Sequence, residues 1–437
     1  MKRPLSEQSE RPDRQAQRCH PMSEQRERPG LQVTVSSRRA STSSRSLPSL
    51  PSLPGSVSPL PDRPVRVFFP CTGLGRQRRG FETFTLECAS ALRDDARLAV
   101  TVFAGADVPE LPVQPLWNLP RDSRGAAWLD RLHGRGGYFS EQITFFLSFL
   151  PHLVRGRPDV VYFADLNLGN LCWHWRRISG QPYRLLFYNG GLTTKPFTRA
   201  DFVQQLTPQG LDEAMARGED ASRQIVLPHG LRVPAELPRR GTDADRAVLG
   251  FPADRPVVLS VGLLDIETKR MDYLIREIAS LPAPRPFLCL LGAESPDTAQ
   301  IRALAAEALG AEHVLVRTVP SERVADYYRA ANVFALASLR EGFGLAYVEA
   351  LAHGLPIVAH DFPVTRYLLG GLASLTDLSR PGAAANGIVA ALAAPQTEEQ
   401  RQTRHASARA RFDWSVLCER YAAMLLRVAQ QPMAARP

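Results

Sequence analysis

The chain has 437 residues, of which 44% are hydrophobic, and this length exceeds what one ordinary core can fill, so we expect two domains. No apolar run reaches the roughly 18 residues that a membrane-spanning helix needs, and the N-terminus lacks the apolar core of a secretory signal. The six cysteines are scattered without a C-x-x-C pair, which argues against a disulfide framework or a zinc site and favours a reducing compartment.

The net charge of +9 is unevenly distributed. Residues 1–64 hold eleven basic and six acidic side chains, so most of the excess lies in this segment. The body is only mildly basic, and the high isoelectric point is weak support for nucleic-acid binding. Lysine occurs only at Lys2, Lys195 and Lys269, so a retained lysine suggests a need for a compact ammonium group.

In chain order, residues 1–64 come first and are rich in Arg, Ser, Pro and Gln. Such a composition cannot bury enough apolar surface to fold, so it predicts a disordered extension. Short apolar runs then predict strands, and apolar residues at helical spacing predict a helix over 81–92. The strands are expected at 65–69, 98–104, 159–163, 183–188 and 225–230.

A segment with little periodicity follows at 231–256, and we place a linker at 236–255 within it. A second alternation begins after the linker. Its strands are predicted at 256–262, 287–291, 313–316, 333–337 and 357–359. Its helices are predicted at 272–280, 321–330 and from Leu345 to about Gly354, with a last helix over 416–429. Alternating strands and helices of this kind predict an α/β fold made of doubly wound, Rossmann-like domains.

One motif stands out, running from Glu341 through Gly-Phe-Gly-Leu-Ala-Tyr-Val to Glu349. Gly342 and Gly344 allow the backbone to approach a ligand closely, and free amides at the helix start near Leu345 suit a phosphate. The two carboxylates lie eight positions apart, so they can reach different ends of one bound molecule. A phosphorylated, polyhydroxylated ligand would satisfy all of these groups.

This motif resembles the E-x7-E donor signature of the retaining glycosyltransferases of family 4, the group 1 glycosyltransferases. The resemblance implies the GT-B fold, in which two Rossmann-like domains face a cleft. The expected arrangement is an acceptor-side domain at 65–235, a nucleotide-sugar-binding domain at 256–415, and a C-terminal helix and tail at 416–437 that packs back toward the first domain.

By the same resemblance, Lys269 is the cation for the leaving diphosphate and Glu341 binds the hydroxyls of the transferred sugar. Glu349 would bind the nucleotide ribose. The remaining donor-binding candidates are Gly342, Phe343, Gly344, Leu345, Val319 and Arg270. The segment around Lys269 departs from the family pattern at two positions. The family has an arginine at the position of Leu263 and a glycine at the position of Arg270. Arg270 or an arginine of the first domain would then have to supply the second cation.

In the first domain, the loop after the first strand carries Gly75, Arg76, Arg78 and Arg79. These arginines either bind a phosphorylated acceptor, an anionic head group or the donor diphosphate, or form a solvated charge run. The family histidine position after the strand at 159–163 is occupied by Ala164, and Asp165 is the neighbouring polar candidate.

The resemblance implies transfer from a nucleotide-diphosphate sugar to a glycan, lipid or small-molecule hydroxyl, with retention by front-face attack and without a metal or other cofactor. No partnership with nucleic acid is expected. We expect a cytoplasmic enzyme, with peripheral attachment to the inner face of the membrane left open. The alternatives are a nucleotide-sugar epimerase, a glycoside phosphorylase, and a non-catalytic nucleotide-sugar-binding protein.

Overall fold

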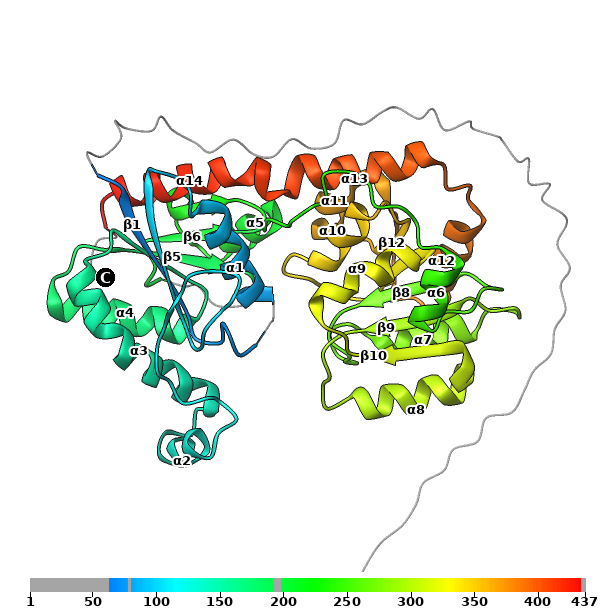
Figure 1. Ribbon diagram of the computed structural model, residues 1–437, viewed down its shortest axis with the longest axis horizontal. Coiled ribbons are helices and arrows are strands. Elements are labelled where there is room, and N and C mark those ends of the chain that lie inside the picture. Colours follow the sequence, from blue (N-terminus) through cyan, green and yellow to red (C-terminus); the bar gives the residue numbers. More distant parts are fainter. Residues whose placement is uncertain (1–62, 78–79, 192–197, 434–437) are drawn as a thin grey trace, which may run out of the picture. The chain divides into compact units, whose positions relative to one another are not determined.

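The computed structural model describes residues 63–77, 80–191 and 198–433, which form two parallel sheets with helices packed around them (Figure 1). The predicted fold class is confirmed. The extension predicted at 1–64 lies outside the described residues up to position 62.

The first sheet has the strand order β3-β2-β1-β4-β5-β6-β7 within the described residues, with all neighbours parallel. Its strands are β1 Val65–Cys71, β2 Leu98–Ala104, β3 Gln114–Pro115, β4 Val160–Phe163, β5 Arg184–Asn189, β6 Phe202–Gln205 and β7 Gln224–Val226. The helices of this part are α1 Gly80–Leu92, α2 Arg124–His133, α3 Gly137–Gly156, α4 Leu166–Ser179 and α5 Pro208–Ala216. The strand order reverses between β1 and β4, and ligands of such sheets bind at the carboxyl ends beside that reversal.

The second sheet has the order β10-β9-β8-β11-β12-β13 in the described part of the chain, and it is also parallel. Its strands are β8 Val257–Val261, β9 Phe287–Leu291, β10 Val314–Arg317, β11 Val333–Leu336, β12 Ile357–His360 and β13 Ser374–Thr376. Its helices are α6 Asp243–Leu249, α7 Met271–Ala279, α8 Thr298–Leu309, α9 Ser321–Ala330, α10 Leu345–Ala352, α11 Pro363–Leu369, α12 Ala383–Ala393 and α13 Glu398–Phe412, followed by α14 Trp414–Gln430.

Both sheets are apolar on both faces, as parallel sheets require. Within β1, Val67 and Phe69 face the cluster that contains α1 and α14, whereas Phe68 faces the cluster that contains α3 and α4. This alternation follows from the two-residue period of a strand. Because such strands are covered on both faces, the apolar runs in the sequence predicted the positions of most of them.

Several elements differ from the sequence-based expectation. The predicted linker at 236–255 contains helix α6, which packs against α9. Thr242 caps this helix, and its seven residues are too few to show a helical period. Strand β6 was also not predicted, because Gln204 and Gln205 interrupt its apolar run although both side chains are buried.

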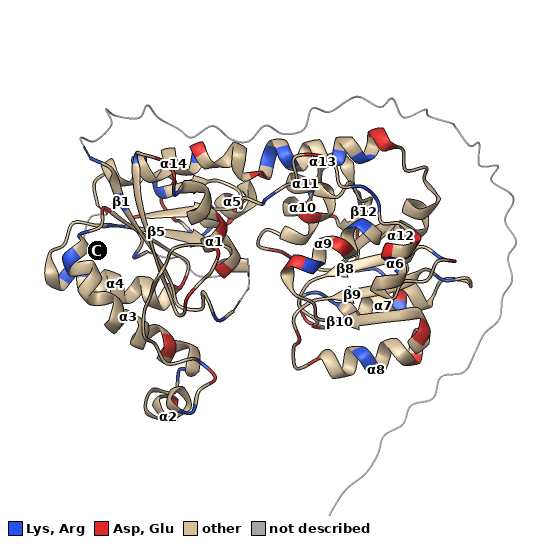
Figure 2. Ribbon diagram, in the orientation of Figure 1, with Lys and Arg blue, Asp and Glu red and all other residues tan. Residues whose placement is uncertain are grey.

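Helix α14 packs on α1 and on β1 of the first sheet (Figure 1). The Trp414 indole donates a hydrogen bond of 2.9 Å to Glu87 of α1. Basic and acidic residues are interspersed over the described elements rather than gathered on one of them (Figure 2). None of the described helices combines the length and the apolar character that crossing a membrane would require.

Candidate active site

A cavity of about 810 Å³ lies where residues that follow strands of the first sheet meet residues that follow strands of the second. Many of the predicted site residues line it. These are Asp165, Lys269, Glu341, Gly342, Phe343, Gly344, Leu345 and Glu349. The sequence-based selection therefore converges on one place in the fold, although it came from three separate segments.

Lys269 reaches the cavity from the loop after β8. The buried Asp265 carboxylate holds this loop by accepting hydrogen bonds from the amides of Thr268, at 3.2 Å, and Lys269, at 2.6 Å. The Lys269 ammonium forms an ion pair with Glu341, and both side chains are largely buried. An ammonium has three protons, so Lys269 can bond Glu341 and a ligand phosphate at once.

The glycine turn orients the start of α10. Gly344 has a φ of +87°, a left-handed conformation that favours glycine, and helix α10 begins at the next residue. A Cβ on Gly342 would lie 2.7 Å from the carbonyl oxygen of Gly190, so this position tolerates only a glycine without a backbone shift. The first amides of α10, at Leu345 and Ala346, lack intrahelical partners by geometry and sit in the cavity lining.

Glu349 lies one turn further along α10. The buried Tyr328 hydroxyl donates a hydrogen bond of 2.8 Å to Glu349 Oε2, and burial raises the pKa of this carboxyl above its ordinary value. Glu349 is thereby fixed in orientation and offers its other oxygen to a hydroxyl ligand.

On the opposite side of the cavity, Asp165 follows β4 and is buried. It accepts hydrogen bonds from the hydroxyls of Tyr138 and Thr72, the latter at 3.3 Å. Burial, aided by the nearby Glu82 carboxylate, raises the pKa of Asp165 to about 6. Arg121 also lines the cavity, but its guanidinium donates to Glu141 at 2.6 Å, which neutralises it.

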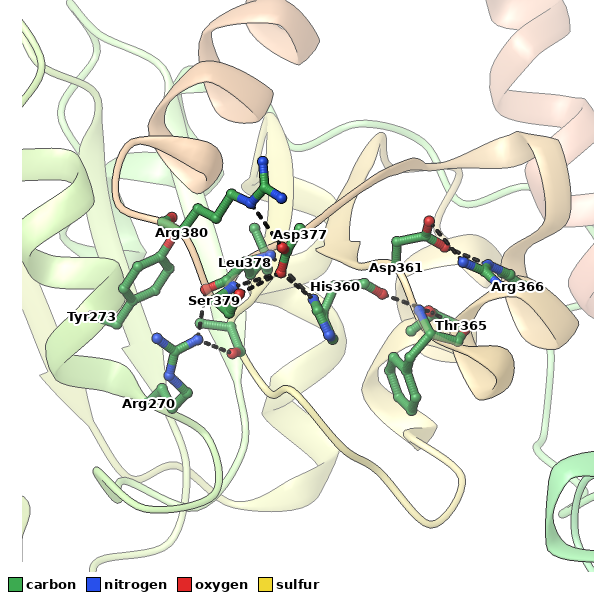
Figure 3. Close-up of polar contacts among 12 residues, drawn as sticks. Arg270, Tyr273, His360, Asp361, Thr365, Arg366, Asp377, Leu378, Ser379 and Arg380 are labelled. Atoms are coloured by element: carbon green, nitrogen blue, oxygen red, sulfur yellow. Dashed lines mark hydrogen bonds and ion pairs between the residues drawn. The ribbon is translucent and has the colours of Figure 1, made fainter. Parts of the chain in front are cut away.

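Arg270 lies outside the described cavity lining. Its guanidinium donates to the carbonyls of Leu378, at 2.8 Å, and Ala337, at 3.3 Å, and stacks on Tyr273 (Figure 3). Its backbone has a φ of +52°, which explains why the family pattern has a glycine here. This placement argues against Arg270 as the second cation for a diphosphate.

The other predicted residues are placed as follows. Gly75 and Arg76 are exposed and are not part of the described lining, and Arg76 bonds Asn118 instead. Val319 is half-buried against the core and also lies outside the lining. Arg78 and Arg79 lie outside the described residues.

The lining residues that sequence analysis did not select include Tyr138, Arg121 and His229. His229 lies three residues after β7 in a Pro-His-Gly sequence, and a polar residue near the end of the strand predicted at 225–230 was the signal that could have found it. Tyr138 and Arg121 come from a region without a recognisable motif.

Known proteins resemble this chain in sequence and in fold. Residues 241–409 match the model of the glycosyl transferases group 1. The D-inositol 3-phosphate glycosyltransferase of Xylanimonas cellulosilytica is 37% identical over 150 residues, which cover 32% of this chain and 36% of that protein. The phosphatidyl-myo-inositol mannosyltransferase of Mycobacterium leprae is 26% identical over 294 residues, which cover 63% of this chain and 74% of that protein. Matches to the inositol phosphate enzymes thus span about a third of those relatives' length.

Among solved structures, sucrose-phosphate synthase from Thermosynechococcus elongatus has a TM-score of 0.69 at 20% identity, covering 83% of this chain and 99% of that one. Anabaena HepE in complex with UDP-glucose has a TM-score of 0.64 at 18% identity, and the match covers 82% of this chain and 99% of HepE. At these identities the likeness shows the fold alone. The chain thus has the GT-B fold, and its residues 241–409 match the model of the group 1 glycosyltransferases.

Proposed function

We propose that this protein is a retaining glycosyltransferase that moves a sugar from a nucleotide-diphosphate donor to an acceptor hydroxyl. The observation that carries the proposal is the ion pair of Lys269 and Glu341 inside the cavity, beside the start of α10. Cleavage of the anomeric bond leaves negative charge on the diphosphate. A preorganised cation and amide groups at that position stabilise this charge in the transition state.

The lining groups that the sequence predicted have separate roles in this proposal. Lys269 and the amides of Leu345 and Ala346 bind the diphosphate, Glu341 accepts from hydroxyls of the transferred sugar, and Glu349 accepts from the ribose. Asp165 faces the acceptor side. Front-face attack places the acceptor hydroxyl next to the departing phosphate, which takes its proton. The substitution at Leu263 leaves Lys269 as the principal cation, because Arg121 is paired with Glu141.

We propose a broad class of acceptor, which is a glycan, a lipid or a small molecule. A lipid acceptor would involve peripheral contact with a membrane. The names of the relatives favour a cyclitol or its phosphate among the first acceptors to test. The proposal includes no metal ion and no nucleic-acid partner.

A donor screen followed by product analysis tests this function. Thermal shift with UDP-glucose, GDP-mannose and ADP-glucose should reveal stabilisation by a donor, since a ligand that binds only the folded state raises the melting temperature. Transfer to an acceptor panel with the bound donor should then give a product whose anomeric configuration, measured by NMR, matches the donor. An inverted product would contradict retention, and donor binding without any transfer would favour the non-catalytic alternative.

A further inference from the structure

His229 is a buried side chain that the roles above do not use. It is 2% exposed, follows β7, and lines the cavity. Its ring lies between aromatic neighbours. It stacks on Phe343, the residue between the glycines of the motif, with ring centroids 5.9 Å apart, and it lies 5.1 Å from the ring of Phe84. The imidazole is therefore fixed against the segment that presents Glu341.

The two ring nitrogens of His229 differ in their contacts. Nδ1 lies 2.6 Å from the Tyr188 hydroxyl, whereas Nε2 is buried and has no hydrogen-bond partner among the described residues. A buried polar group without a partner is destabilising, because it has given up its hydrogen bonds to water and gained none in return. Aromatic rings line the site on two sides, so an ordered water would find few of the polar partners that it needs.

The contact with the Tyr188 hydroxyl favours one tautomer of His229. Burial raises the pKa of Tyr188 well above its ordinary value and lowers the pKa of His229 to about 3, so the phenol keeps its proton and the imidazole is neutral near pH 7. The bond to Nδ1 is the contact that the structure gives the Tyr188 hydroxyl. A phenol that donates to Nδ1 uses its proton in this contact, whereas a phenol that accepts from Nδ1–H would not. Donation to Nδ1 places the single proton of the neutral imidazole on Nε2.

We propose that His229 binds the donor through a hydrogen bond from Nε2–H to an oxygen of the sugar that is transferred, with Tyr188 fixing the tautomer. This inference rests on the proposed function and assigns a further sugar-binding residue. The position of the ring on Phe343 supports the sugar rather than the nucleotide, because Glu341 and Gly342 directly precede Phe343 in the donor motif. The Nε2–H group of the neutral imidazole is an uncharged hydrogen-bond donor, which suits an uncharged sugar hydroxyl.

Two variants separate the hydrogen bond from the packing. His229→Phe keeps an aromatic ring but removes Nε2–H, and His229→Gln loses the ring but retains an N–H donor of similar reach. Calorimetry compares UDP-glucose with UDP, GDP-mannose with GDP, and ADP-glucose with ADP. His229→Phe is expected to weaken binding of the nucleotide sugar by roughly 5–50-fold and to leave the nucleoside diphosphate within about twofold. His229→Gln should recover part of the loss.

The matched control is His405→Phe. His405 is also buried, its Nδ1 is bonded to the Ala352 carbonyl, and its Nε2 likewise has no partner among the described residues, but it lies outside the described cavity lining. This variant should change neither affinity.

An unchanged ratio of nucleotide-sugar to diphosphate affinity in His229→Phe would overturn the inference, as would an equal loss for both ligands. If the wild-type protein binds nucleoside diphosphates but not nucleotide sugars, the inference also fails. If it binds neither, the proposed function falls together with it.

Discussion

Lys269 and Glu341 lie 72 positions apart in the sequence and form an ion pair inside the cavity. Lys269→Ala should lower kcat by about 10²–10³-fold, because the cation acts on charge that develops in the transition state. Glu341→Ala should also reduce kcat, and the double variant should lose less than the product of the two effects, since the residues are in contact. Steady-state kinetics on the purified variants measures these values.

The control for this pair is Arg302→Ala, which breaks an exposed ion pair with Glu294 at 2.6 Å, outside the described cavity lining. Its kcat should match that of the wild-type protein. A Lys269→Ala enzyme that is as fast as this control would refute the role of Lys269.

Arg270 should affect stability rather than turnover. Arg270→Ala removes two hydrogen bonds to backbone carbonyls but keeps the left-handed backbone, so we expect a loss of about 2 kcal/mol in the free energy of unfolding. Arg270→Gly should lose about 1 kcal/mol less, because glycine adopts this conformation without strain. Urea unfolding provides the comparison. A large drop in kcat with unchanged stability would instead restore Arg270 as a diphosphate ligand.

Tyr328→Phe should weaken donor binding without slowing chemistry. The change removes the hydroxyl that donates to Glu349, so the pKa of Glu349, already raised by burial, should rise further. We expect KM for the donor to increase about threefold to tenfold at an unchanged kcat, with a larger increase at pH 6 than at pH 8. A pH-independent effect on KM would mean that Tyr328 acts through packing alone.

Asp165→Asn should change the pH dependence of stability. The folded-state pKa of Asp165 is about 6, above the ordinary value of 3.8, so its ionisation is disfavoured in the folded protein. The wild type should therefore lose stability relative to the variant as the pH rises from about 4 to 7, by up to about 3 kcal/mol. Urea unfolding at several pH values measures this difference. Asp94→Asn, at a position with an 87% exposed side chain, is the control and should show a much smaller change.

Removal of divalent metals should leave transfer intact. In the proposed mechanism, the protein's own cation and amides stabilise the leaving diphosphate. Dialysis against EDTA should thus preserve kcat within about twofold. A loss that added Mg²⁺ or Mn²⁺ reverses would show that a metal ion assists departure of the diphosphate.

The sequence alone determined the features that depend on neighbouring residues. Buried apolar runs located most strands, since a parallel strand is covered on both faces, and the Glu341–Glu349 segment fixed its own turn and helix start through Gly344. The sequence did not predict the short helix α6 or the glutamine-containing strand β6, because neither shows the apolar pattern expected of its type.

The tertiary structure decided which distant side chains meet. It joined Lys269 to Glu341, and it turned Arg270 away toward the carbonyls of Ala337 and Leu378. It also placed His229 on Phe343, with one nitrogen unpaired among the described residues. The physical reason is that local pattern reports backbone preference and burial. The direction of a long side chain, by contrast, depends on partners that other strands bring to the same edge of a sheet.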